Sequence, residues 1–366
     1  MISNVYSPFN LKVRSAKGIE LQTDKGVFID TFSGIGVLSF GHSNEEIINA
    51  ITEQVNKYAH LSNYFLDDNA VKISENISKM IGKKSETFFT NSGTESTEAA
   101  IKAVKKNKKG KIVSFNNNFH GRTCASLSIT YNPKIREPFE PLADNRVFLP
   151  LEKDAFIEYT KNNEIAGVFL ECVQGNSGVF GIDEDLINTI NKLKTEKNYF
   201  IVCDEVQAGL GRTGKFFSYQ NYNIEPDIVT LAKALGGGLP LGAAVFINFS
   251  PFGKGDHGST FAPNPVSLAS GKVVIEKVMK PGFLDSVKEK GKYFSEKLRE
   301  LNWVNDVREY GLMIGVSTPD SKKVKEKAFE NRVLLNIAND QIRFLPALNI
   351  THEEIDMIIE KLDFEV

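Results

Sequence analysis

Polar side chains stand directly after several short apolar runs in this 366-residue sequence. They are the segment 91–95 after the run 86–90, Glu171 after 165–170, Asp204 after 199–203, and Lys233 shortly after 228–231. A carboxylate that closes a buried strand is costly unless it is paired, so a cation should face it. A lysine flanked by apolar residues is a candidate for an amine of lowered pKa, which Schiff-base chemistry requires.

The first of these positions is also suited to an anion. Ser92 and Glu95 have the spacing of a capping box at a helix start, and Gly93 lets a backbone approach closely. Free N–H groups and the helix dipole there favour a phosphate. Taken singly, each feature also has an ordinary interpretation: a capped helix, a salt-bridged carboxylate, or a surface lysine. Together they match the parts that hold pyridoxal phosphate: a phosphate site, an aspartate for the pyridine nitrogen, and a lysine for the covalent bond.

The elements that must position these residues follow from the hydrophobic pattern. Between about 85 and 250, short β-branched runs alternate with amphipathic helical stretches, which is typical of a mostly parallel sheet flanked by helices. Six strands are expected, at 86–90, 111–115, 165–171, 199–204, 227–231 and 242–247. Ligands of such a doubly wound α/β fold gather at the carboxyl ends of the strands, where the polar residues stand.

The two ends of the chain have a different pattern. Residues 10–40 contain short runs broken by glycines, which predict a small β meander. After Pro265 two helical patterns, short strands at 312–316 and 341–344, and a helix from Thr351 are expected. We therefore expect a large cofactor-binding α/β domain at 41–262 and a smaller α+β domain assembled from 1–40 and 263–366.

Composition excludes several classes of protein. Basic and acidic side chains number 44 and 46, a net charge of −2, which does not favour a nucleic-acid partner. No apolar run is long enough for a membrane span, and the amino-terminal residues lack the pattern of a signal segment, so a soluble cytoplasmic protein is expected. The five histidines show no metal-binding spacing, so no metal site is expected.

Successive motifs resemble those of the class III pyridoxal-phosphate-dependent aminotransferases. They are 91–95 (NSGTE), 119–123 (FHGRT), 204–214 (DEVQAGLGRTG), 226–238 (PDIVTLAKALGGG) and 258–261 (GSTF). The resemblance runs in order from about Tyr6 to the end and is closest to the acetylornithine and succinylornithine aminotransferase branch. It implies the fold known as fold-type I of the pyridoxal-phosphate-dependent transferases.

The resemblance also implies roles for individual residues. Lys233 would be the Schiff-base lysine and Asp204 the partner of the pyridinium nitrogen. The other cofactor-binding positions would be Ser92, Gly93, Thr94, Phe119, His120, Glu171, Val206, Gln207, Ser259 and Thr260, with Phe119 stacked on the ring and Gln207 near the phenolic oxygen. Thr260 would reach the phosphate of the neighbouring subunit, so a homodimer is expected. Tyr6, Arg122, Glu171 and Arg343 would bind the substrates, the two arginines through carboxylates.

The implied reaction moves the terminal amino group of N2-acetylornithine or N2-succinylornithine to 2-oxoglutarate, as in arginine biosynthesis. Alternatives are another ω-amino donor, such as 4-aminobutyrate, ornithine or an acyl-lysine-type substrate, and a glutamate-semialdehyde aminomutase. A non-enzymatic alternative, a cofactor-binding scaffold with a regulatory role, is disfavoured by Lys233, Asp204 and both arginines. Two positions depart from the pattern of many relatives: Asn176 stands in place of a glutamate, and Ile35 in place of the tyrosine of ornithine aminotransferases.

Overall fold

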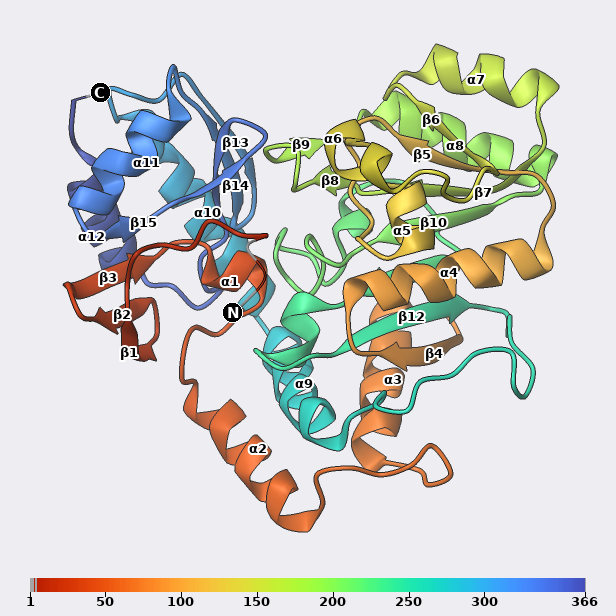
Figure 1. Cartoon of the computed structure of the whole chain (residues 1–366), viewed down its shortest axis with the longest axis horizontal. Coiled ribbons are helices and arrows are strands. Elements are labelled where there is room, and N and C mark those ends of the chain that lie inside the picture. Colours follow the sequence, from red (N-terminus) through yellow and green to blue (C-terminus); the bar gives the residue numbers. More distant parts are fainter. Residues whose placement is uncertain (1–2, 4, 366) are drawn as a thin grey trace.

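A seven-stranded sheet lies at the centre of the larger lobe of the molecule, which is seen on the right of Figure 1. The computed structural model describes residue 3 and residues 5–365. The strand order is β4-β12-β11-β10-β7-β5-β6, with β12 antiparallel to both neighbours and the other strands parallel. Its strands are β4 (Ser85–Thr90), β5 (Lys111–Phe115), β6 (Arg146–Leu149), β7 (Ile165–Leu170), β10 (Phe200–Asp204), β11 (Ile228–Leu231) and β12 (Gly242–Ile247).

Helices cover both faces of this sheet. Those of the larger lobe are α2 (Glu45–Lys57), α3 (Asp68–Ile81), α4 (Gly93–Asn107), α5 (Cys124–Ser128), α6 (Pro133–Arg136), α7 (Lys153–Asn162), α8 (Glu184–Lys197) and α9 (Pro265–Val278). Short 3₁₀ turns occur at η1 (Glu137–Phe139), η2 (Ser218–Asn221) and η3 (Lys233–Gly236), and β8 (Val173–Gln174) pairs with β9 (Phe180–Gly181). The α/β fold class expected from the sequence is confirmed.

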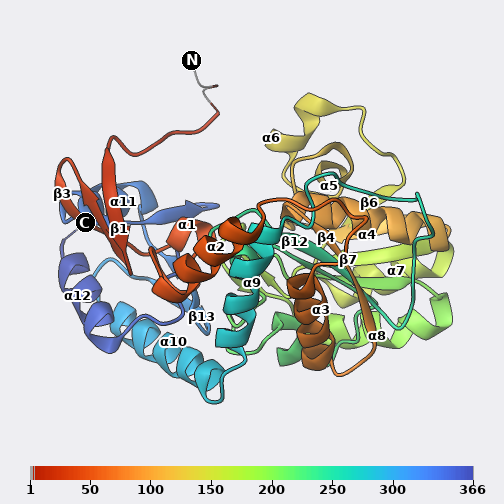
Figure 2. The ribbon, with the colours of Figure 1, turned by 90° about the horizontal axis from the view of Figure 1, so that it is seen from below.

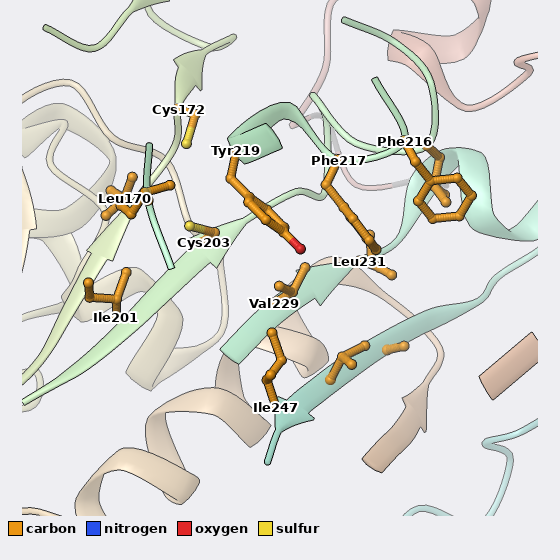
Figure 3. Close-up of a cluster of buried hydrophobic side chains, with 14 of the residues drawn as sticks. Leu170, Cys172, Ile201, Cys203, Phe216, Phe217, Tyr219, Val229, Leu231 and Ile247 are labelled. Atoms are coloured by element: carbon orange, nitrogen blue, oxygen red, sulfur yellow. The ribbon is translucent and has the colours of Figure 1, made fainter. Parts of the chain in front are cut away.

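Burial on both faces explains why the strands read as continuous apolar runs. Ile201 and Val202 are neighbours in β10 but belong to different apolar clusters, because successive side chains of a strand point to opposite faces. Val229 and Ile228 in β11 divide in the same way. Figure 3 shows part of the cluster on one face, where Tyr219 and Phe217 pack over the side chains of β10 and β11.

All six expected strands of this sheet are present, whereas β6 was not predicted. β6 has four residues, begins with Arg146 and lies at the sheet edge beside β5. An edge strand is covered less completely and needs no continuous apolar run, so its signal in the sequence is weak.

Within the described residues, the smaller lobe contains two four-stranded sheets, three long helices and one helix of a single turn. One sheet has the order β1-β2-β3-β15, and the other β13-β14-β17-β16. Their bounds are β1 (Val13–Lys17), β2 (Glu20–Thr23), β3 (Gly26–Asp30), β13 (Asp306–Tyr310), β14 (Met313–Ser317), β15 (Val333–Leu334), β16 (Asn336–Ala338) and β17 (Gln341–Phe344). The helices are α10 (Phe283–Arg299), α11 (Ser321–Glu330) and α12 (His352–Leu362), and α1 (Ser33–Gly36) is a single turn that follows β3.

Both ends of the chain contribute to the core of this lobe. Ile19 and Ile29 pack in one apolar cluster with side chains of α10, α12 and the strands between them. Figure 2 shows the amino-terminal strands beside α11 and α12. Side chains of α9 belong to the large cluster instead. The domain boundaries at 40/41 and 262/263 remain a prediction. None of the helices in the described part of the chain has the length and hydropathy that a bilayer crossing requires.

Candidate active site

A cavity of about 420 Å³ opens at the carboxyl edge of the large sheet. The parallel strands β4, β5, β7, β10 and β11 end at this edge, and each sends its following residues toward the cavity. The predicted site residues that line it are Ser92, Gly93, Thr94, Phe119, His120, Arg122, Glu171, Asp204, Val206, Gln207 and Lys233. The fold thus brings together side chains that lie up to 141 positions apart in the sequence, from Ser92 to Lys233.

Lys233 lies at the start of η3, two residues after β11 ends. Its φ of 44° falls in the left-handed region, which costs about 1–3 kcal/mol for a residue with a side chain and is often found at functional sites. The Ser96 hydroxyl holds the strand end in place by donating to the Leu231 carbonyl at 3.0 Å. Burial, and then the positive charge of Arg343, lower the pKa of Lys233 from 10.5 to about 8, against the opposing effects of Asp204 and Glu171.

Asp204 is held by two donors. His120 Nδ1 lies 2.7 Å from Asp204 Oδ2, and the Val206 N–H donates to Oδ1 at 3.1 Å. Because the carboxylate is the acceptor, Nδ1 of His120 carries the proton. Asp204 is only 6% exposed, so the histidine provides the partner that a buried carboxylate needs. A fixed negative group of this kind can hold a proton on a ring nitrogen placed in the cavity.

Glu171 closes β7 beside this pair and accepts a hydrogen bond from the Phe119 N–H at 2.8 Å. Burial, opposed by the charge of His120, raises the pKa of Glu171 to about 7. Glu205, which follows Asp204 at the end of β10, does not line the cavity. Glu205 accepts from the Ser218 hydroxyl at 2.7 Å and from the Tyr219 N–H at 2.9 Å, so it anchors η2 under the site.

The amino terminus of α4 forms the anion-binding corner of the cavity. Ser92 is the N-cap and its Oγ accepts from the Glu95 N–H at 3.3 Å. The second half of the expected capping box is wrong: Glu95 reaches one residue further back and accepts from the Asn91 N–H at 2.6 Å. A Cβ at Gly93 would lie 2.7 Å from Val206 Cγ1, so glycine is needed for the helix start to approach this closely.

The Thr94 hydroxyl is engaged by the following loop. Thr94 Oγ1 accepts from the Arg122 and Thr123 N–H groups, each at 3.2 Å, and lies 2.6 Å from Ser126 Oγ. What this corner offers a phosphate is therefore mainly backbone N–H groups and the helix dipole. The same contacts bring Arg122 to the rim of the cavity, where its guanidinium carbon lies 5.7 Å from the centre of the Phe119 ring.

Arg343 in β17 lies behind the cavity wall and is 2% exposed. Its Nη1 donates to the Gly175 carbonyl at 2.8 Å and to Gln207 Oε1 at 3.0 Å. Gln207 lines the cavity and uses its amide oxygen on Arg343, so the NH₂ group of Gln207 remains available as a donor. Nε and Nη2 both donate to Asn336 Oδ1, at 3.0 and 2.7 Å.

Besides Arg343, three predicted residues do not line the cavity of this chain: Tyr6, Ser259 and Thr260. Tyr6 is 83% exposed, and Thr260 is exposed as well. Ser259 is close to the site, with its Oγ 3.4 Å from Asn91 Nδ2.

Sequence reasoning missed Asn336 and the wall residues Val37, Leu239 and Pro240. Asn336 could have been found as the one polar residue of the run 333–338, at the position that pairs with Arg343 across a hairpin.

These residues fit pyridoxal phosphate. The start of α4 at Gly93 offers backbone N–H groups to a phosphate, Asp204 carries the anion for a pyridine nitrogen, and Lys233 supplies an amine of lowered pKa. Arg122 and Asn176 also line the cavity. No group of three or more His, Cys, Asp or Glu side chains that could hold a metal occurs among residues 3 and 5–365.

Comparisons with known proteins agree with this arrangement. The model of the family "Aminotransferase class-III" matches residues 1–364. A protein of Aquifex aeolicus named acetylornithine aminotransferase is 39% identical, over 99% of this chain and 98% of the relative. One of the same name from Clostridium acetobutylicum is 38% identical, over 97% of this chain and 96% of the relative.

Solved structures give the same result. The ornithine aminotransferase of Toxoplasma gondii superposes with a TM-score of 0.91 at 25% identity, over 99% of this chain and 91% of that chain. The N-acetylornithine aminotransferase of Stenotrophomonas maltophilia has a TM-score of 0.83 at 27% identity, over 97% and 95% of the two chains. With a family model that spans nearly the whole sequence and full-length relatives above 30% identity, the chain belongs to the class III aminotransferases.

Proposed function

We propose that this protein is a pyridoxal-phosphate-dependent aminotransferase that moves the terminal amino group of an N2-acylornithine to 2-oxoglutarate. The products are the acylated glutamate semialdehyde and glutamate. The observation that carries the proposal is the convergence of Lys233, the His120–Asp204 pair and the amino terminus of α4 on one cavity. The names of the full-length relatives support acetylornithine as the donor.

Pyridoxal phosphate, when bound, supplies an electron sink for the electrons left behind when a proton leaves the amine-bearing carbon of the donor. Lys233 is the residue that would hold it covalently. Asp204 would hold a proton on the ring nitrogen of the bound cofactor, and His120 fixes the orientation of that carboxylate. Because its pKa is lowered to about 8, Lys233 Nζ is suited to move a proton between the two carbon atoms bonded to the transferred nitrogen. It would accept the proton from the substrate carbon and donate it to the carbon on the cofactor side.

Arg122 and Arg343 are the proposed carboxylate-binding groups, since a planar guanidinium suits bidentate capture of a carboxylate. Asn176 lines the cavity in place of an acid that could neutralise Arg343. The positive charge is therefore available to an extra carboxylate on the acyl group, and N2-succinylornithine should be the better donor. The test is kcat/KM for both donors: equal values, or a preference for the acetyl compound that survives Asn176→Glu, would remove this part of the proposal.

A homodimer completes the proposed site. Thr260 is exposed and outside the cavity of its own chain, and the adjacent Phe261 is 66% exposed. Tyr64 and Leu66, in the segment that Asn63 joins to this loop, are 96% and 80% exposed. Asn63 Nδ2 ties the two segments together by donating to the carbonyls of Ser259 and Ala262, at 2.8 and 3.1 Å. Large exposed apolar side chains on two segments that are joined in this way favour an interface.

Mixing two inactive variants tests this arrangement. If Thr260 serves the partner's cavity, a mixed dimer of Lys233→Ala and Thr260→Ala chains contains one complete site and one doubly defective site. Refolding equal amounts together should restore about a quarter of wild-type activity, because half of the dimers are mixed and each has one good site. Activity no greater than that of the separate variants would rule out a shared site.

Turnover without an oxo acid distinguishes the reaction classes. A transaminase given an acylornithine alone completes only half of its cycle, and a second turnover requires 2-oxoglutarate. An aminomutase converts glutamate semialdehyde repeatedly without any oxo acid. Repeated turnover of glutamate semialdehyde alone, with no activity on acylornithines, would replace the proposed reaction with the alternative.

A further inference from the structure

Arg343 is a buried cation whose hydrogen-bond partners are all uncharged. Two bonds go to the carboxamide oxygen of Asn336, one to the carbonyl of Gly175 and one to the amide oxygen of Gln207. No carboxylate of the described residues forms an ion pair with it, although it is only 2% exposed. Buried charges are normally paired, so this pattern needs an explanation.

We propose that Asn336 is a positioning residue that aims the Arg343 guanidinium while leaving its charge free for a substrate carboxylate. This inference rests on the proposed function, in which Arg343 is one of two carboxylate-binding arginines. The substrate class it selects is the dicarboxylates, which can reach Arg122 with one carboxylate and Arg343 with the other.

The hairpin of β16 and β17 explains how the asparagine does this. Asn336 and Arg343 are directly opposite in the antiparallel register, so their side chains lie on the same face of the sheet. On the other side of β17 the residue opposite Arg343 is Gly315, which has no side chain. Asn336 is therefore the only cross-strand neighbour that can fix the guanidinium, and it fixes two of the three nitrogens through a single oxygen.

The donor count leaves one N–H of Arg343 without an acceptor among the described residues. A guanidinium carries five N–H groups, one on Nε and two on each terminal nitrogen. Nε uses its group on Asn336, Nη1 uses both on Gly175 and Gln207, and Nη2 uses one on Asn336. The second N–H of Nη2 has no acceptor among the residues that the structure describes. An aspartate at position 336 would accept the same two bonds but would also cancel the charge.

Asn336→Asp separates the positioning of the Arg343 guanidinium from the neutralisation of its charge. The two side chains have nearly the same size and the same acceptor positions, but only aspartate carries a negative charge. We expect KM for 2-oxoglutarate to rise about tenfold or more, with kcat within about twofold of wild type, because the new carboxylate competes with that of the substrate. The ratio of kcat/KM for 2-oxoglutarate to that for pyruvate, which has one carboxylate, should fall accordingly. The thermal midpoint should not fall, since both hydrogen bonds remain and gain charge. A purely structural asparagine would leave the ratio unchanged.

The matched control is Asn339→Asp, which adds the same charge to the same hairpin at an exposed position. It should leave the ratio at the wild-type value. Glutarate binding, measured by calorimetry on the cofactor-loaded protein, gives a second readout that needs no turnover: its Kd should rise about tenfold in Asn336→Asp and stay unchanged in Asn339→Asp.

The outcomes are distinct. The inference is overturned if Asn336→Asp changes neither the ratio of kcat/KM for 2-oxoglutarate and pyruvate nor the Kd for glutarate. It is also overturned if kcat/KM falls equally for 2-oxoglutarate and pyruvate. If Asn336→Asp does not fold, Asn336→Ala takes its place: removal of the two acceptors should also weaken glutarate binding, and wild-type affinity would overturn the proposal. Failure of the wild-type protein to transfer amino groups to 2-oxoglutarate would instead refute the proposed function, while the glutarate measurement would still decide the role of Asn336.

Discussion

The lowered pKa of Lys233 can be measured directly on the protein without cofactor. Only the neutral amine attacks an aldehyde, so the rate of pyridoxal phosphate attachment to the apoprotein should follow the deprotonated fraction of Lys233. With a pKa of about 8, about a quarter of the amine is neutral near pH 7.5, against about one part in a thousand for an ordinary lysine of pKa 10.5. The fraction of reactive, neutral amine therefore differs about 240-fold between the two cases.

The assay is the second-order rate constant for attachment, followed by the absorbance of the bound cofactor across about pH 6 to 10. The rate should rise with pH and level off above a midpoint near 8. Two variants should move the midpoint in opposite directions. Arg343→Met removes a positive charge and should raise the pKa of Lys233, whereas Glu171→Gln removes a negative charge and should lower it. Glu309→Gln, a partly buried acid in β13, is the control and should not move it. A midpoint near 10.5, or shifts of the same sign in both variants, would refute the electrostatic reasoning.

Three further predictions concern the frame around the site. Gly93→Ala should weaken cofactor binding about tenfold or more in an equilibrium titration, because the added Cβ would lie 2.7 Å from Val206 Cγ1. Adding Val206→Ala should restore most of the lost affinity, and no recovery would contradict the steric explanation. Phe217→Ala removes a fully buried ring and should cost about 3–5 kcal/mol in urea unfolding, whereas Phe139→Ala, 63% exposed, should cost less than about 0.5 kcal/mol; equal costs would contradict the packing described here. Asp204→Asn should lower kcat about a hundredfold or more because a neutral amide cannot hold the ring nitrogen protonated, and a loss confined to KM would argue against that role.

The sequence allowed prediction of the elements with the strongest physical constraints. Strands covered on both faces must be apolar throughout, so β5, β10 and β12 could be located within one residue of their bounds. The edge strand β6 lacks that constraint and was missed. Polar residues at strand ends, such as Asp204 and Lys233, were visible because they interrupt apolar runs that have no other reason to stop.

Contacts between distant segments were beyond sequence reasoning. The pairing of Asp204 with His120 joins residues 84 positions apart, and nothing in either motif specifies which partner the carboxylate takes. Glu95 was expected to return to Ser92 but accepts from Asn91, because the chain geometry before the helix decides which N–H is within reach. Asn336 was missed because its role depends on strand register, which a single sequence fixes only weakly for strands of three or four residues.

The most direct test of the account is to reduce the cofactor-loaded protein with borohydride and map the labelled peptide. The account predicts a stable pyridoxyl group on Lys233, in the peptide that contains the triple glycine at 236–238, and none in Lys233→Ala. A label on another lysine, or a wild-type protein that binds the cofactor but yields no labelled peptide, would contradict the central claim.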